Sequence, residues 1–146
     1  MKVVLDTNVV LAAMIKPSGL SALLIKALDG ERLINFTSED ALDELTLKIG
    51  LLAEKGKISP GWEGILAHFL RGSEIVSPST SFNLCRDPDD NKWLEIAYAA
   101  GASYILTWDD DLLSLRNKEK AVKLGNHEVK ILKPVEFHRE ILKSKY

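Results

Sequence analysis

The sequence predicts an α/β fold, a single three-layer domain over residues 1–146 in which helices cover both faces of a central parallel sheet. Short apolar strands alternate with helices along the chain, which is typical of parallel sheets. The first strand, KVVLD at residues 2–6, is rich in Val and Leu without polar alternation, as expected of a strand buried on both faces. A chain of 146 residues also suits one domain with one buried core.

Local signals place the individual elements. Gly30 and Gly101 follow apolar runs, where glycine often ends a helix, and Pro134 stands where proline often begins one. Ser38 has a side chain that caps helices, and apolar residues recur on one face of the segment after it. In chain order we expect strands at 2–6, 32–36, 73–78, 103–107 and 127–132, and helices at 20–30, 38–53, 60–71, 90–101 and from 134 onward. Residues 109–126 carry the weakest pattern, and we assign no element there.

The composition excludes several classes of protein. With 46% apolar and 27% charged residues the chain is globular, and its longest apolar runs are far shorter than the roughly 20 residues that span a bilayer. One cysteine, Cys85, excludes an internal disulfide framework, and three dispersed histidines with one cysteine do not make a zinc site. The chain opens on a strand and not on a signal peptide, so we expect a cytoplasmic protein with no membrane partner.

Charge is distributed unevenly along the chain. Residues 1–111 carry 10 Lys and Arg against 17 Asp and Glu, whereas residues 112–146 carry 9 against 4. An acidic body with a basic C-terminal segment could hold a metal ion in one place and attract polyanions in another. A solvated, Lys-rich final helix is the simpler explanation of the basic segment.

Carboxylates gather at the ends of two predicted strands. Asp6 ends the first strand, and the run Asp109-Asp110-Asp111 follows the strand at 103–107. Ligands of parallel sheets bind beyond the carboxyl ends of the strands, so these acids should share one edge. Like charges this close raise one another's pKa unless a cation relieves them. The sequence therefore predicts a cation site at this edge.

Asp90 adds a third carboxylate to this prediction. Trp93, Leu94 and Ala97 follow it at i+3, i+4 and i+7, the positions that share a helix face with residue i. Asp90 therefore points toward the core, where an unpaired charge is very costly and needs a partner. We expect its neighbour Asp89 to cap the helix instead.

Three segments resemble the PIN-domain nucleases, and in particular the branch of toxin components related to the VapC ribonucleases. They are VVLDTNVVLAAM, SEDALDEL and DPDDNKWLEIAYAAGASYILTWDDDLL, which occur in family order and span most of the chain. The last segment is the most specific, because it combines an acid, a helix, Gly, a strand and Thr-x-Asp. The resemblance implies a parallel five-stranded α/β/α sandwich.

The resemblance also assigns roles to individual residues. It implies that the catalytic acids are Asp6, Glu44, Asp90 and Asp109, with Asp111 as an auxiliary metal ligand. Small polar residues at Asn8, Ser38 and Thr107 would orient the carboxylates or a metal-bound water. By their positions near the acids we expect phosphate contacts from Arg86, Lys92, Lys118, Lys120 and Lys123, and base stacking on Trp108, which is unusually bulky for its place.

A site made of carboxylate oxygens, without His or Cys ligands, suits Mg²⁺ or Mn²⁺. We expect Asp6, Asp90 and Asp109 to hold one ion, with Glu44 ligating through water or helping to hold a second. The implied activity is metal-dependent endoribonuclease cleavage of RNA phosphodiester bonds. The implied partners are an RNA substrate, a cognate antitoxin and a second copy in a homodimer.

Two other functions fit part of the pattern. A receiver-type phosphoacceptor domain is also parallel α/β with acids at strand ends, but it needs an Asp at the end of the third strand. The segment SEIVSPS ends without one, and Lys133 matches the required lysine only loosely. A catalytically silent PIN scaffold that binds nucleic acid is the other alternative, and the presence of all four acids argues against it.

Overall fold

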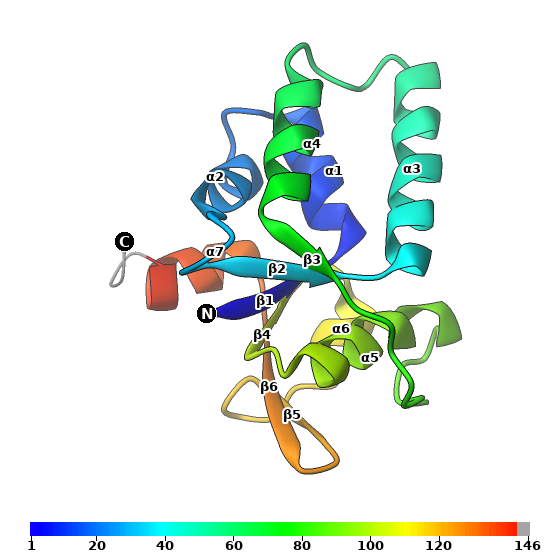
Figure 1. The fold of residues 1–146 in the computed structure, drawn as a ribbon, viewed down its shortest axis with the longest axis vertical. Coiled ribbons are helices and arrows are strands. Elements are labelled where there is room, and N and C mark those ends of the chain that lie inside the picture. Colours follow the sequence, from blue (N-terminus) through cyan, green and yellow to red (C-terminus); the bar gives the residue numbers. More distant parts are fainter. Residues whose placement is uncertain (143–146) are drawn as a thin grey trace.

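The protein forms a six-stranded sheet between two layers of helices (Figure 1), as described by a computed structural model over residues 1–142. The strand order is β3-β2-β1-β4-β6-β5; all neighbours are parallel except β5 and β6. The strands are β1 (Lys2–Leu5), β2 (Ile34–Thr37), β3 (Ser73–Ile75), β4 (Tyr104–Leu106), β5 (Ala121–Leu124) and β6 (His127–Leu132).

Helices α1 to α4 lie on one side of the sheet and α5 and α6 on the other (Figure 1). The helices are α1 (Thr7–Ile15), α2 (Leu20–Ala27), α3 (Glu39–Glu54), α4 (Trp62–Arg71), α5 (Asn91–Ala100), α6 (Asp110–Leu113) and α7 (Pro134–Phe137). A 3-10 turn at Pro88–Asp90 precedes α5, and a π-helical turn at His138–Leu142 follows α7.

The central strand β1 is buried on both faces. Val3 and Leu5 belong to the apolar core beneath α1, α2 and α4, while Val4 belongs to the core beneath α5. All three side chains are at most 3% exposed. Burial on both faces explains why this strand is apolar without alternation.

The predicted three-layer α/β architecture and its five parallel strands are confirmed. The sixth strand, β5, was not predicted, and it pairs antiparallel with β6 through the two-residue loop Gly125-Asn126. Gly125 has a φ of +60°, which glycine adopts without strain. A Gly-Asn pair between two apolar runs is a hairpin signal, so the sequence did contain the evidence for this strand.

Near the N-terminus, one helix was missed by the sequence analysis and another ends earlier than predicted. The helix α1 was not predicted, because its segment is apolar on nearly all sides and shows no helical period. The helix α2 ends at Ala27 and not at Gly30, because Leu28 is extended. The Asp29 carboxylate then accepts hydrogen bonds from the backbone N–H groups of residues 31–33, which starts the turn before β2.

Within residues 1–142 no single helix is long and apolar enough to cross a bilayer. The pair α1 and α2 reaches that length and composition only together, across a bend of 113°. Their buried residues include Val9, Val10, Leu24 and Ile25, which form part of the apolar core.

Candidate metal-binding site

The acids lie where the strand order of the sheet reverses. β1 and β4 are neighbours, and the chain leaves β1 toward β2 on one side and leaves β4 toward β6 on the other. Parallel sheets bind ligands at such a switch point, beyond the carboxyl ends of the strands. Asp6 follows β1 directly, and Thr107 follows β4. The topology therefore brings both segments to one crevice.

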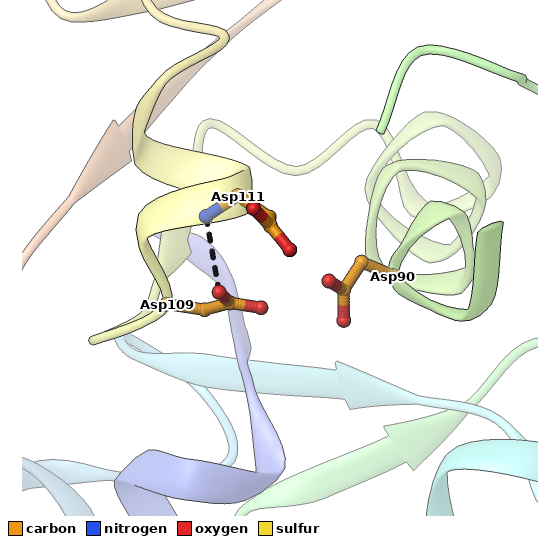
Figure 2. Close-up of side chains that lie close together, drawn as sticks. All are labelled: Asp90, Asp109 and Asp111. Carbon is orange, nitrogen blue, oxygen red and sulfur yellow. Dashed lines mark hydrogen bonds between the residues drawn. The ribbon is translucent and has the colours of Figure 1, made fainter. Parts of the chain in front are cut away.

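Three carboxylates converge there: Asp90, Asp109 and Asp111 each place an oxygen within 4.8 Å of the others. Figure 2 shows Asp109 and Asp111 on the short helix α6 facing Asp90 at the start of α5. The chain thus crosses from one wall of the crevice to the other between residues 90 and 109. This spacing is set by the helix α5 and the strand β4.

Local hydrogen bonds fix the α6 wall of the cluster. Asp109 caps α6, and its carboxylate accepts a hydrogen bond of 3.0 Å from the N–H of Asp111. Its own N–H donates to the hydroxyl of Thr107 at 2.9 Å. The four-residue helix α6 therefore positions Asp109 and Asp111, while its residues Leu112 and Leu113 anchor it in the apolar core.

On the opposite wall, Asp90 occupies the cap position of α5 but makes no capping hydrogen bond. The capping role that we expected of Asp89 was wrong. Asp87 caps the preceding turn by accepting a hydrogen bond from the N–H of Asp89, and the Asp89 carboxylate pairs with Lys92. The carboxylate of Asp90 is consequently available to face Asp109.

Asp6 is not one of the three converging carboxylates and is 5% exposed. Its carboxylate accepts a hydrogen bond of 2.7 Å from the Thr107 hydroxyl, and it also accepts one from the N–H of Asn8. Burial raises the pKa of Asp6 to about 6, with smaller contributions from the charges of Glu44 and Asp109. One hydroxyl, that of Thr107, therefore connects Asp6 to Asp109.

The cluster carries more negative charge than its surroundings neutralise. Burial, together with a hydrogen bond and charge repulsion from Asp109, raises the pKa of Asp90 to about 7. Asp111 pairs with the guanidinium of Arg86 at 2.8 Å. The Arg86 side chain is 87% exposed, so solvent weakens this pairing. A carboxylate whose pKa is raised by burial and by a neighbouring acid is typical of a functional site, where a cation can relieve the repulsion.

Glu44, on α3, has a different environment from the cluster. Its carboxylate accepts a hydrogen bond of 2.5 Å from Thr7 and one of 3.0 Å from Lys92, and Lys48 lies 3.6 Å away. Burial raises the pKa of Glu44, but the bonds from Thr7 and Lys92 outweigh it and the net pKa is lowered. Glu44 is therefore ionised and already paired within the protein.

Residues 2–111, three quarters of the chain, match the sequence profile of the PIN domain. The chain belongs to the PIN-domain family. It is 40% identical over 146 residues to the uncharacterised protein MJ1680 of Methanocaldococcus jannaschii, covering 97% of this chain and 92% of that protein. It is similar in fold to a chain of VapBC2 from Rickettsia felis, solved with a DNA fragment from their promoter, with a TM-score of 0.55 and 16% identity over 91% of this chain and 98% of that one.

The small polar residues of this PIN domain have distinct contacts. Thr107 bridges two acids, and the side-chain oxygen of Asn8 accepts a hydrogen bond from the N–H of Trp108. Ser38 caps α3 by accepting from the N–H of Ala41, so its predicted helix cap is confirmed. Thr7, which pairs with Glu44, was missed, although its place directly after Asp6 could have drawn attention to it.

The expected nucleic-acid contacts fall into two groups. Near the cluster, Trp108 is 40% exposed and donates its indole N–H to Ser21, while Arg86 and Lys92 are paired with acids of the site. Beyond α6, Lys118 is exposed in the loop before β5, and Lys123 lies on β5. Lys120 pairs with Glu136 and Glu140, so its charge is used within the protein.

The donors of the cluster fit a hard divalent cation. Three carboxylates supply oxygen ligands, which suit Mg²⁺ or Mn²⁺ and not softer metals. Cys85 is 7% exposed, and burial, with smaller contributions from the surrounding acids, raises the pKa of its thiol to about 12. Its thiol is therefore protonated at neutral pH in the metal-free protein, and Cys85 is not among the three side chains that converge in the cluster.

Proposed function

We propose that this PIN-domain protein is a Mg²⁺- or Mn²⁺-dependent endoribonuclease. The observation that carries the proposal is the convergence of Asp90, Asp109 and Asp111 within 4.8 Å, with no buried cation of the protein to neutralise them among the described residues. Membership of the PIN-domain family supports it, since its nucleases are the proteins that the sequence motifs resemble.

In this proposal each side chain has a defined task. Asp90, Asp109 and Asp111 hold the cation, and Asp6 sets the position of Asp109 through Thr107. A divalent ion bound there would lower the pKa of water for attack on a phosphodiester and neutralise the charge that develops. Trp108 and Arg86 stand exposed at the rim, where they can contact a base and a phosphate.

The strand order argues against a receiver-type phosphoacceptor. Taken in chain order, the five parallel strands lie in the order 3-2-1-4-5, because β6 is the fifth of them. Receiver domains have the flavodoxin-like order 2-1-3-4-5. The third strand, β3, ends at Ile75 and is followed by Val76. No aspartate therefore stands at its end to accept a phosphoryl group.

Cleavage of RNA by purified variants tests the proposal. Asp90→Asn and Asp109→Asn should each abolish Mn²⁺-dependent cleavage while circular dichroism stays unchanged. The matched control is Asp110→Asn, because Asp110 lies in the same acidic run but is exposed and outside the cluster. Equal cleavage by Asp110→Asn and Asp109→Asn proteins would contradict the proposal, and so would RNA binding without cleavage by the wild type.

We further propose that the nuclease is the toxin of a toxin–antitoxin pair and forms a homodimer. Likeness in fold to a chain of VapBC2 supports the pairing. Expression of the wild type should stop bacterial growth, the Asp109→Asn variant should not, and co-expression of the product of the adjacent reading frame should restore growth. In sedimentation velocity, the purified protein should have the mass of two chains, and the mass of one chain would contradict the homodimer.

A further inference from the structure

Both oxygens of Glu44 are occupied by the protein. Oε2 accepts the Thr7 hydroxyl at 2.5 Å, and Oε1 accepts the Lys92 ammonium at 3.0 Å. The ammonium of Lys48 lies 3.6 Å from Oε1 as well. A metal ion on Oε1 would have to compete with two ammonium groups, and an ion on Oε2 would share that oxygen with the Thr7 hydroxyl.

Lys92 is held in place and is not a flexible surface lysine. Its side chain is 16% exposed, and its ammonium also pairs with Asp89 at 3.3 Å and lies 5.8 Å from the ring centre of Trp93. The Glu44 side chain is similarly covered, at 15% exposed. Removing one partner of such a covered pair is costly, because the other charge is left unpaired.

The crevice thus has two halves with different charge. Within residues 1–142, the half formed by Asp90, Asp109 and Asp111 pairs only with the highly exposed guanidinium of Arg86. The half formed by Glu44 holds a covered ammonium that belongs to the chain. The two halves are connected through residues 6 and 7: Thr7 donates to Glu44, while Asp6 accepts from the Thr107 hydroxyl, which in turn accepts the N–H of Asp109.

We propose that the ammonium group of Lys92 takes the place of a second divalent ion, so that the site binds a single metal ion and Glu44 positions Lys92. The proposal rests on the nuclease function proposed above. In two-metal nucleases two cations stabilise the attacking and leaving oxygens. Here Lys92 supplies the second positive charge by donating N–H groups to a phosphate oxygen, and no bond to Lys92 forms or breaks.

Counting bound Mn²⁺ by electron paramagnetic resonance and calorimetry tests the proposal. The wild type should bind one ion per chain. Glu44→Gln should still bind one ion with an affinity within about threefold of wild type, because Glu44 is not a ligand. Two ions in the wild type, or loss of the ion in Glu44→Gln, would overturn the proposal.

Substitution of Lys92 gives the second arm of the experiment. Lys92→Met should bind one Mn²⁺ with unchanged affinity but cleave RNA at least about 100-fold more slowly, and Lys92→Arg should recover part of the rate. Lys48→Met is the matched control, since Lys48 is 48% exposed and more distant, and it should cleave like the wild type. If Lys92→Met does not fold, Lys92→Gln replaces it.

The outcomes separate this inference from the proposed function. Two bound ions with active cleavage contradict only the role of Lys92. Full cleavage by folded Lys92→Met with one bound ion also contradicts only that role. One bound ion without any cleavage of RNA contradicts the nuclease function instead.

Discussion

Two carboxylates beyond the carboxyl edge of the sheet, Asp90 and Glu136, have opposite electrostatic surroundings. Glu136 accepts hydrogen bonds from Arg116 at 2.7 Å and from the N–H of Lys133 at 2.8 Å, and Lys120 lies 3.1 Å away. Burial raises the pKa of Glu136, but these partners outweigh it and lower the pKa to about 2. Burial and the neighbouring acid raise the pKa of Asp90 to about 7.

The difference shows that this chain can neutralise a covered carboxylate with its own cations. It does so at Glu136, which connects α7 to the loop before β5, and at Glu44. Within the described part of the chain, no covered cation neutralises Asp90, Asp109 or Asp111. The first arrangement stabilises the fold, whereas the second leaves charge for a ligand to neutralise, at a cost in stability.

The largest expected effect is on metal affinity. Asp109→Asn should weaken Mn²⁺ binding by about 100-fold or more, because it removes a charged ligand while the amide oxygen can still cap α6. Glu136→Gln should leave the affinity unchanged, because Glu136 is satisfied by the protein. Isothermal titration calorimetry measures both, and equal losses would remove the distinction between the two acids.

The same comparison predicts stability changes of opposite sign. Glu136→Gln should lower the free energy of unfolding by about 2 kcal/mol, since it weakens charged hydrogen bonds to Arg116 and Lys120. Asp90→Asn should raise the stability of the metal-free protein, because it removes repulsion from Asp109. Urea denaturation in EDTA measures both, and destabilisation by Asp90→Asn would refute the repulsion.

The dependence of stability on pH should also differ between Asp6 and Asp90, whose pKa values are raised, and Glu136, whose pKa is lowered. Asp6 and Asp90 have raised pKa values, so the folded chain binds more protons than the unfolded chain between about pH 4 and 7. The metal-free protein should therefore gain on the order of 1 kcal/mol as the pH falls from about 8 to about 5. Glu136 does not contribute there, because its stabilisation is lost only below about pH 4.

Denaturant titrations in EDTA across this range measure the slope. The Asp90→Asn variant provides the control and should reduce the slope. A metal-free protein that became less stable between pH 8 and pH 5 would contradict the raised pKa values.

The smallest effect is expected at Arg86. Arg86→Ala removes an ion pair with Asp111, but the side chain is 87% exposed, so stability should change by less than about 0.5 kcal/mol. Mn²⁺ affinity should rise a few-fold, because the guanidinium competes with the ion for Asp111. Isothermal titration calorimetry measures the Mn²⁺ affinity, and thermal denaturation measures the stability. Weaker Mn²⁺ binding by the variant would show that Arg86 assists the ion.

The parallel part of the fold was predictable because its signals are local. Gly101 adopts a left-handed conformation at the end of α5, and Ser38 caps α3, as the sequence indicated. The helix α1 was not predictable from periodicity, because its half-buried or exposed positions Leu11, Ala12 and Ile15 are as apolar as its buried ones. The end of α2 depended on the Asp29 side chain and not on the nearby glycine.

The site was predictable as far as strand ends and helix faces determine it. Asp6 and Asp109 follow neighbouring parallel strands, so their proximity follows from topology. The pairing of Glu44 with Lys92 was not predictable, because it joins α3 to α5 across 48 positions of the sequence. Lys92 was expected to contact phosphate from its charge and its position beside the acids, and only the tertiary contact shows its bond to Glu44.

The bond from Thr107 to Asp6 spans 101 positions of the sequence and has a consequence for synthesis. A ribosome that has translated Asp6 must add 101 further residues, about seven tenths of the chain, before Thr107 is made. Until then the acids of the crevice cannot meet. A nascent or prematurely terminated polypeptide that lacks Thr107 therefore lacks the assembled site.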